Sequence, residues 1–298
     1  MSLFFRRISI FGRFPFVRLI QVIDNPAFIL QMLKKNLIYK RSTIEYKPMY
    51  AQFKFLSGQE TLEELMSSGR SLARFSDGEF ELITGAGIYP PDSDWCQKWS
   101  SELRDDTLSA LSSSDSRLLV AVDPPSTFLA SRDSIHSIRF EWNMWVDMRR
   151  LMWKYLAPGG VFGHSHLFLK TNCPDLDWKT MKNFLADKNI VIATGNIEKL
   201  MHLNLGMHTF FIECGTENAY ERKDEIKREI RELISSAGLS KDKTIVFASL
   251  GPTAGIIAHQ LLDDNICVWD TGHMFEFADK NFIENVLDNK AKRSCACG

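Results

Sequence analysis

The sequence predicts an α/β fold in which helices flank a mostly parallel sheet, and two observations lead to this class. From about residue 57, short apolar runs alternate with amphipathic stretches, which is the pattern of consecutive βα units. With 298 residues and 45% hydrophobic content, the chain can bury a full core and lies near the upper size of a single domain. We therefore expect one large domain with an appendage.

The first half of this domain alternates helical and extended patterns. "TLEELMSSG" has the apolar spacing of a helix closed by Gly69, and "SLARFS" after it is typical of a strand. "WCQKWSSELRDDTLSALSS" has helical spacing again, and "RLLVAVDPP" predicts a buried strand stopped by prolines. The segment "RFEWNMWVDMRRLMWKYLAPGG" is aromatic and basic on a helical period. Core packing explains this pattern, and a platform for stacking sugars is the alternative for Trp142, Trp145, Met152 and Trp153.

The second half repeats the alternation more clearly. "NIVIATG" and "HTFFIECG" predict strands that enter turns, and "AYERKDEIKREIRELISSAG" predicts a helix with a charged, solvated face. "TIVFASLGPTAGIIAHQLLDDN" and "ICVWDTGHMFEF" follow as strand, glycine turn, helix, strand and loop. Open parallel sheets bind ligands beyond the carboxyl ends of their strands, so we expect the functional site in these turns.

Composition narrows the class of protein. The formal net charge of −1 gives no bulk field that would gather nucleic acid. Six cysteines are scattered along the chain and only Cys295 and Cys297 lie close together, which favours reduced thiols over disulfides or a zinc knuckle. The sequence contains no run of about eighteen apolar residues, so it predicts no membrane-spanning helix. We expect a cytoplasmic protein without a nucleic-acid partner.

The amino-terminal segment "MSLFFRRISIFGRFPFVRLIQVI" interleaves large apolar residues with Arg6, Arg7, Arg13 and Arg18. It lacks the continuous apolar centre and cleavage site of a secretory signal. This amphipathic, basic composition suits peripheral contact with the anionic inner face of a membrane. A helix or extended arm packed on the domain, or on the second subunit of a homodimer, is an equal alternative, and Pro15 argues against one uninterrupted helix.

Three predicted strand-end loops carry the side chains that could perform chemistry. They are "FSDGEFE" with Asp77 and Glu79, "SLGPTAG" over residues 251 to 255, and "WDTGHMFE" with Asp270 and His273. If their strands are parallel members of one sheet, all three loops open on the same edge. Together they would supply carboxylates, backbone N–H donors and an imidazole.

Each loop has a functional and a structural interpretation. The Asp77-x-Glu79 pair fits Mg²⁺ or Mn²⁺ that also grips a diphosphate, or Asp77 simply caps the next helix. "GPTAG" offers backbone amides and the Thr253 hydroxyl to a phosphate at a helix start, or Thr253 is a cap. His273 suits a general base, a phosphate contact or a metal ligand, and Asp270 precedes it by three residues.

Two further patterns are weaker. In "FGHSH", the spacing of His164 and His166 on an extended segment points both side chains the same way, as in paired zinc ligands, but no third ligand is evident nearby. A Ser-His-Asp hydrolase would need a G-x-S-x-G elbow, which the sequence lacks.

The loops also resemble a known family. "LARFSDGEFELITG" is similar to the R-F-G-D-G-E segment of the bacterial GT-D-type glycosyltransferases, and "ASLGPTAGIIAHQLLDDNICVWDTGH" to their closing G-P-T-A … D-x-G-H segment. The resemblance spans roughly residues 56 to 278 and rests on two distant motifs in the correct order. It implies a Rossmann-like domain that binds a nucleotide-sugar donor and holds a divalent metal, usually taken as Mn²⁺, on the diphosphate.

The resemblance also implies roles for individual residues. Asp77 and Glu79 become the metal pair, and the cofactor-binding set is Arg74, Gly251, Pro252, Thr253, Ala254 and Gly272. His273 is the first hypothesis for the base that an acceptor hydroxyl needs, and Asp270 is the second. The sequence departs from the family pattern at Ser76, where glycine is usual, and at Lys170, where an arginine is more frequent; that lysine weakens any bidentate phosphate contact.

The function expected from this resemblance is a metal-dependent glycosyltransferase that uses a nucleotide sugar, most simply a UDP-sugar. Its acceptor would be a bacterial glycan or lipid-linked glycan of capsule, lipopolysaccharide or glycoprotein biosynthesis. Alternatives are a metal-dependent phosphohydrolase and a non-catalytic nucleotide-sugar-binding subunit of a polysaccharide assembly complex. The expected organisation is an arm over residues 1–55, the GT-D-type domain over 56–285 and a tail over 286–298.

Overall fold

A computed structural model describes most of the predicted domain. The described residues are 51–85, 97–123, 151–152, 154–169, 173, 176–195 and 197–277, with Asp77 described by its backbone alone. Almost all of them belong to one of the chain's two compact units, built from Gln52–Pro124 and Tyr155–Gly298.

Several sequence predictions fall elsewhere in the chain. The basic arm before residue 51, the segment with Trp142 and Trp145, and the tail with Cys295 and Cys297 lie outside the described residues. The predicted boundaries between arm, domain and tail therefore stay predictions.

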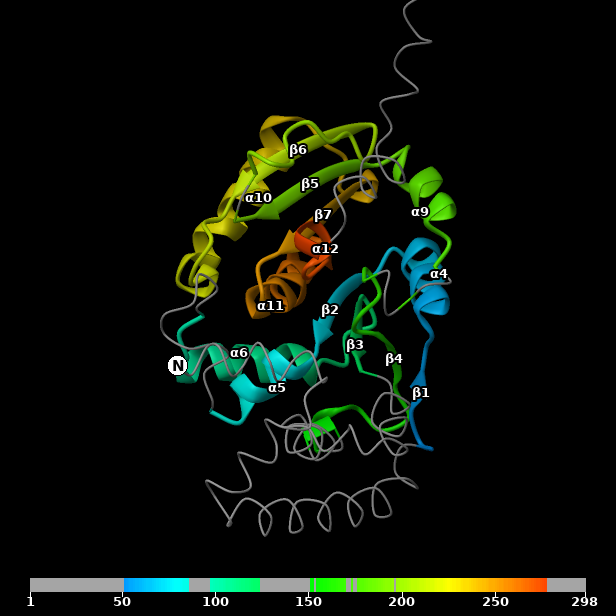
Figure 1. Ribbon diagram of the computed structural model, residues 1–298, viewed down its shortest axis with the longest axis vertical. Coiled ribbons are helices and arrows are strands. Elements are labelled where there is room, and N and C mark those ends of the chain that lie inside the picture. Colours follow the sequence, from blue (N-terminus) through cyan, green and yellow to red (C-terminus); the bar gives the residue numbers. More distant parts are fainter. Residues whose placement is uncertain are drawn as a thin grey trace, which may run out of the picture. The chain divides into compact units, whose positions relative to one another are not determined.

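Eight strands form one sheet, in the order β1-β4-β3-β2-β8-β7-β5-β6 (Figure 1). Every described pairing in it is parallel. The strands are β1 Lys54–Phe55, β2 Ser71–Phe75, β3 Leu118–Val122, β4 Val161–His164, β5 Asn189–Thr194, β6 His208–Glu213, β7 Thr244–Ser249 and β8 Cys267–Asp270. The α/β class with a mostly parallel sheet is confirmed.

The helices follow the strands as the sequence pattern predicts. They are α4 Gly58–Ser68, α5 Asp77–Ile83, α6 Ser101–Leu111, α9 Trp178–Leu185, α10 Lys223–Ser236, α11 Pro252–Gln260 and the single turn α12 Met274–Phe277, with 3₁₀ turns at Ala219–Arg222, Lys241–Lys243 and Leu261–Asp264. Gly69 ends α4 in a left-handed conformation with φ 68°, which glycine adopts without strain. Within the described ranges, no helix has the length and apolarity needed to cross a bilayer.

The two faces of the sheet are covered by different helices. Leu62 and Leu65 of α4 and Met181 of α9 share one buried cluster with alternate residues of the strands, such as Leu72 of β2. The neighbouring residue Ala73 points to the other face, where α11 packs against β2 and β8 and also contacts α6. This alternation is the period of two expected for a strand buried on both faces.

Trp269 of β8 is the largest fully buried side chain among the described residues. Its ring stacks on Phe247 at 5.6 Å and on Phe184 at 6.1 Å between centroids, with Phe168 beyond at 6.4 Å. Its indole N–H donates to the carbonyl of Arg70 at 3.1 Å, so the one polar group of the ring has a hydrogen-bond partner. These contacts fix the end of β8, and with it the position of the next residue, Asp270.

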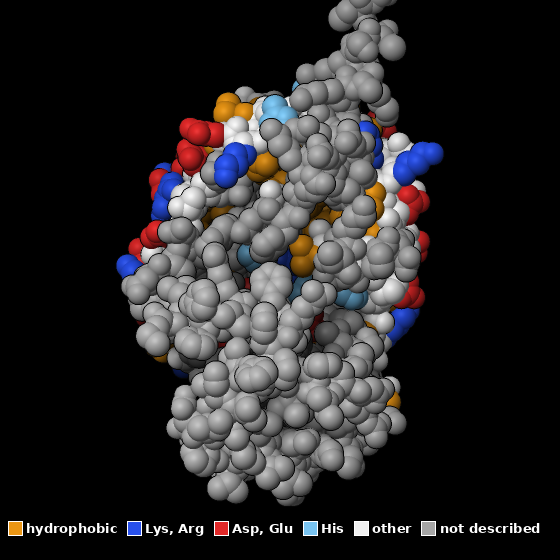
Figure 2. All heavy atoms as spheres, viewed as in Figure 1, with side chains coloured by type: hydrophobic (Ala, Val, Ile, Leu, Met, Phe, Trp, Pro, Cys, Tyr) orange, Lys and Arg blue, Asp and Glu red, His pale blue; other side chains and the backbone are white. Residues whose placement is uncertain are grey.

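Helix α10 is the predicted charged helix, and its buried residues Ile226, Ile230 and Ile234 recur every four positions. Its exposed side pairs opposite charges three and four residues apart, as in Arg228–Glu232. Figure 2 shows both signs of charge interspersed along this flank. The prediction of a solvated helical face is confirmed.

Candidate functional site

The candidate site lies where β2, β3, β4 and β8 end. The register pairs Phe75 with Val122 and Val122 with His164, so the residues that follow these strands reach the same edge. β2 and β8 are neighbours in the sheet although Arg74 and Asp270 are 196 residues apart in the sequence. Two distant motifs therefore meet at one edge, as the parallel sheet predicts.

Arg74 and Asp270 form the first contact across this edge. The Asp270 carboxylate accepts from the Arg74 backbone N–H and from its Nε, both at 3.2 Å. The guanidinium also donates through Nη1 to the carbonyl of Ser165 at 2.5 Å. Burial raises the pKa of Asp270, and the positive charge of Arg74 opposes that rise. The pair joins the R-F-x-D-G-E motif on β2 to the D-x-G-H motif on β8.

Gly272 lies beside this pair, at a position where a side chain would not fit. Its backbone N–H donates to Asp270 at 3.0 Å, and its φ of +50° is one that L side chains rarely adopt. A Cβ built on Gly272 would lie 1.6 Å from Nη2 of Arg74. The glycine of the D-x-G-H motif thus leaves room for the arginine of the other motif.

Asp123, directly after β3, is a second residue that links strand ends, and it is fully buried. It accepts from the Ser76 hydroxyl at 2.9 Å, from the Ser165 hydroxyl at 2.5 Å and from Nε2 of His166 at 2.8 Å. Burial alone would raise the pKa of this carboxyl, but the His166 hydrogen bond and charge, followed by the two hydroxyls, hold it below its ordinary value. Asp123 is therefore a buried carboxylate held ionised by three partners.

The predicted metal pair lies at the start of α5, immediately after Ser76. Glu79 accepts from the Ser76 backbone N–H at 2.8 Å, so this carboxylate also caps the helix. Asp77 is the first residue of α5, and its side chain lies outside the described atoms. Ser76 stands where the family usually has glycine, and its hydroxyl links this helix start to Asp123.

The G-P-T-A motif forms the start of α11. Gly251 is the N-cap with φ 57°, Pro252 is the first helical residue, and no side chain caps this helix within the described part of the chain. The Thr253 hydroxyl is buried and finds no partner among the described residues. A Cβ added at Gly255 would lie 3.7 Å from Asp270, so this helix start adjoins the Arg74–Asp270 pair. Uncapped amides and the helix dipole suit an anion.

The remaining predicted residues lie near this edge or outside the description. His273 is half-buried in the turn between β8 and α12. His164 ends β4, and burial, followed by the neighbouring His166, lowers its pKa. Lys170 lies outside the described residues. Among the described side chains, which do not include that of Asp77, no three His, Cys, Asp or Glu residues are grouped as metal ligands would be.

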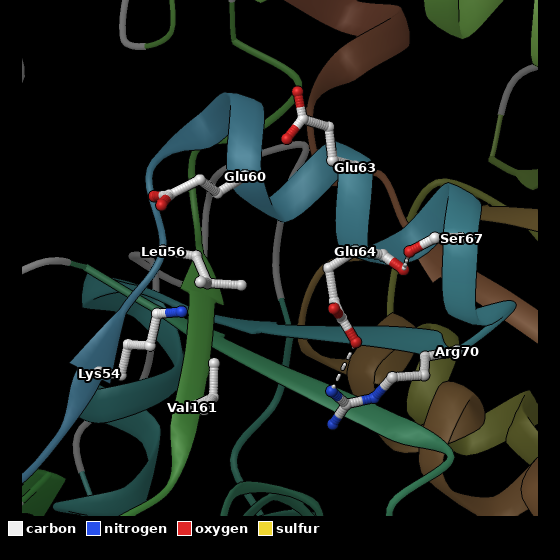
Figure 3. A pocket seen from close by; sticks show the side chains of 8 residues that line it. All are labelled: Lys54, Leu56, Glu60, Glu63, Glu64, Ser67, Arg70 and Val161. Atoms are coloured by element: carbon white, nitrogen blue, oxygen red, sulfur yellow. Dashed lines mark hydrogen bonds and ion pairs between the residues drawn. The ribbon is translucent and has the colours of Figure 1, made fainter.

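A separate cleft of about 450 Å³ lies beside α4, and Figure 3 shows its lining. Acidic side chains of α4 face Lys54 and Arg70, and Arg70 is bonded to Glu64 at 3.2 Å. None of its lining residues belongs to the loops that follow β2, β3, β7 or β8. The polar network at the strand ends, rather than this cleft, contains the predicted motifs.

Comparison with known proteins agrees with the geometry. The family model described as glycosyltransferase GT-D fold matches residues 72–289. The chain belongs to this family. The match covers β2 to β8 and therefore every motif residue of the candidate site.

Curated relatives are longer than this chain. It is 27% identical over 266 residues to "Probable glycosyl transferase Gly" of Streptococcus gordonii, covering 84% of this chain and 35% of the relative. It is 23% identical over 229 residues to "Glycosyltransferase GlyD" of Streptococcus pneumoniae serotype 4, covering 72% and 26%. The chain thus spans about a third or less of these relatives.

Solved structures support the fold. A structure of domain of unknown function 1792, described as having a distinct glycosyltransferase fold, has a TM-score of 0.60 at 19% identity and covers 80% of this chain and 82% of its own. A glycosyltransferase with this domain from Streptococcus sanguinis has a TM-score of 0.59 at 22% identity, covering 82% and 97%. These likenesses show that the GT-D fold is shared.

Sequence reasoning missed Asp123, Ser165 and the bond between Asp123 and His166. The available signal was the position of Asp123: "VAVDPP" places an aspartate after a buried strand, as "CVWDTG" does for Asp270. His166 was noted only as one of two histidines for zinc. Its actual partner comes from another strand end, which spacing within "FGHSH" does not reveal.

We predict that Gly272→Ala destabilises the protein more than Gly238→Ala. Both glycines have positive φ, at +50° and +61°, and share a strain of about 1–2 kcal/mol on substitution. The space beside Gly238 is open, whereas a Cβ at Gly272 displaces Arg74 from its buried pair, which costs about 3 kcal/mol more. Urea unfolding measures both losses. Equal losses would show that the Arg74 contact is unimportant.

We also predict that Asp123 makes the protein sensitive to acid. Because its folded pKa lies below the value of about 3.9 for an unfolded aspartate, the stability it contributes is present above that pH. This stability is lost as the pH falls through the folded pKa. The difference in unfolding free energy between the wild type and Asp123→Asn should shrink between pH 6 and pH 3. Parallel pH curves for the two proteins would contradict the assignment.

Proposed function

We propose that the chain is a metal-dependent glycosyltransferase that moves a sugar from a nucleotide-sugar donor, a UDP-sugar, to a bacterial glycan acceptor. Membership of the GT-D family supports the type of reaction. The observation that carries the proposal is that Arg74, from the first motif, is bonded to Asp270, from the last, beside the starts of α5 and α11. Carboxylates, a cation and free helix amides thereby meet at one sheet edge.

The donor diphosphate is assigned to the start of α11. Two observations support this placement: no described side chain caps the helix, and the Thr253 hydroxyl is buried without a described partner. Gly251, Pro252 and Ala254 shape the turn. Gly272 keeps Arg74 in place beside it, so a fixed positive charge adjoins the anion site.

Asp77 and Glu79 are the residues that would hold Mn²⁺ or Mg²⁺. The donor chemistry fits, since hard carboxylate oxygens at a helix start suit a cation whose shell is completed by phosphate oxygens and water. Bound there, the ion would stabilise charge on the departing nucleoside diphosphate. The capping bond from the Ser76 backbone N–H to Glu79 orients that carboxylate before any ligand arrives.

Two further sequence predictions bear on the proposal. His273, the first hypothesis for the base from the sequence, lies in the turn after β8. The bonds from Arg74 and Gly272 to Asp270 give that carboxylate an orienting function, which weakens its claim as a base. Peripheral contact of the basic arm with the inner membrane face, where lipid-linked acceptors would be met, is also proposed from the sequence.

We expect UDP with MnCl₂ to raise the melting temperature of the wild type but not the melting temperature of Asp77→Asn or Glu79→Gln. At a ligand concentration a hundred times Kd, binding adds about 2.7 kcal/mol of stability. Glutamine can still cap the helix as glutamate does, so Glu79→Gln removes the charge and keeps the fold. Glu81→Gln, on the same helix, is the control and should keep the shift.

An unchanged shift in both motif variants would refute the metal assignment. Release of UDP from UDP-glucose, UDP-galactose or UDP-N-acetylglucosamine should depend on a sugar acceptor. Release of inorganic phosphate without acceptor would instead favour a phosphohydrolase, and binding without turnover a nucleotide-sugar-binding subunit.

A further inference from the structure

Asp123 and His166 form a bonded pair, and neither residue belongs to the sequence motifs. The two side chains come from different strand ends, after β3 and β4, and are joined at 2.8 Å. Asp123 is completely buried, whereas the His166 side chain is 23% exposed. An imidazole that a ligand can reach is thus backed by a carboxylate that water cannot reach.

The contact fixes which nitrogen of His166 carries the proton. An ionised carboxylate only accepts hydrogen bonds, so Nε2, which faces Asp123, carries a proton and is the protonated nitrogen whenever the ring is neutral. The other nitrogen, Nδ1, then holds a lone pair, and it contacts no partner among the described residues. This is the arrangement of a base whose partner sets its tautomer and orientation.

Two hydrogen-bonded connections place this pair within the candidate site. One runs from Asp123 to the Ser76 hydroxyl and from the Ser76 backbone to Glu79 of the predicted metal pair. The other runs from Asp123 through Ser165, whose carbonyl accepts from Arg74. His166 therefore belongs to the same rigid network as the residues assigned to the donor.

We propose that His166 is the catalytic base for the acceptor and that Asp123 is its positioning residue. The inference rests on the proposed transfer reaction. Nδ1 of His166 takes the proton of the acceptor hydroxyl while its oxygen bonds to the anomeric carbon. The bond from that carbon to the diphosphate oxygen breaks, and its electron pair leaves with the nucleoside diphosphate. The imidazolium, stabilised by Asp123, later releases its proton to water.

The competing base is His273. The described contacts show a buried carboxylate directly bonded to the His166 ring. The two histidines can be separated by matched substitutions.

The test compares His166→Gln, His273→Gln and His202→Gln in the full-length chain. Glutamine can still donate to Asp123 but cannot accept a proton as a base, so the network is kept while the base is removed. We expect His166→Gln to lower kcat for acceptor-dependent UDP release by about 100- to 10,000-fold. The melting-temperature shift with UDP and MnCl₂ should be unchanged. The exposed His202 is the control, with wild-type turnover.

Three outcomes would overturn the assignment. Wild-type turnover in His166→Gln, or a loss of turnover only in His273→Gln, would exclude His166 as the base. Loss of the UDP–Mn²⁺ shift together with turnover would place His166 in donor binding instead. A wild-type chain that neither binds UDP with Mn²⁺ nor releases UDP would refute the proposed function itself, and the base with it.

The position of the proton on His166 can be measured without any substrate. Long-range ¹H–¹⁵N correlation spectra of the wild type should show His166 as the Nε2–H tautomer, with the signal assigned by its absence in His166→Gln. Asp123→Asn should mix the two tautomers and lower kcat while leaving KM for the donor unchanged. An Nδ1–H tautomer in the wild type would contradict the proposal.

Discussion

The structure of the site depends on the burial of one charge, the Asp123 carboxylate at the end of β3. A carboxylate removed from water is costly unless hydrogen bonds replace its hydration. Here Ser76, Ser165 and His166 supply those bonds from the ends of β2 and β4. Satisfying one buried charge therefore ties three strand ends together and holds the start of α5 in place. A partly satisfied network would cost more than an apolar core, so its members act as a unit.

A second pair extends this constraint to β8. Arg74 is bonded to Asp270 on one side and to the Ser165 carbonyl on the other, so it connects the Asp123 network to the last motif. Gly272 leaves the space that the guanidinium occupies. The residues of the two family motifs thus have a structural role besides ligand binding: the arginine, aspartate and glycine together form one contact between β2 and β8. A site built on rigid strand ends keeps its charges preorganised for a developing negative charge.

Local sequence patterns were sufficient for much of the fold. Apolar runs, prolines and glycine turns located the strands and the charged helix α10, because burial on both faces of a parallel sheet gives short continuous apolar segments. The parallel pattern predicted only that the loops share one edge. The strand order and the contact between Arg74 and Asp270 were not predicted, because they join distant parts of the chain. The bond between Asp123 and His166 was missed, because it depends on which strands are neighbours and no local spacing encodes that. Glu79 was assigned to metal alone, whereas its cap on Ser76 required the backbone geometry.

The positions at which Mn²⁺ and UDP bind test the proposed site most directly. Crystals grown with UDP and MnCl₂, measured at the manganese absorption edge, would locate the ion by its anomalous scattering. We expect a peak between the carboxylates of Asp77 and Glu79 at the start of α5, with the diphosphate at the start of α11. A peak in the cleft between Lys54 and Arg70 in Figure 3, or none at α5, would contradict it.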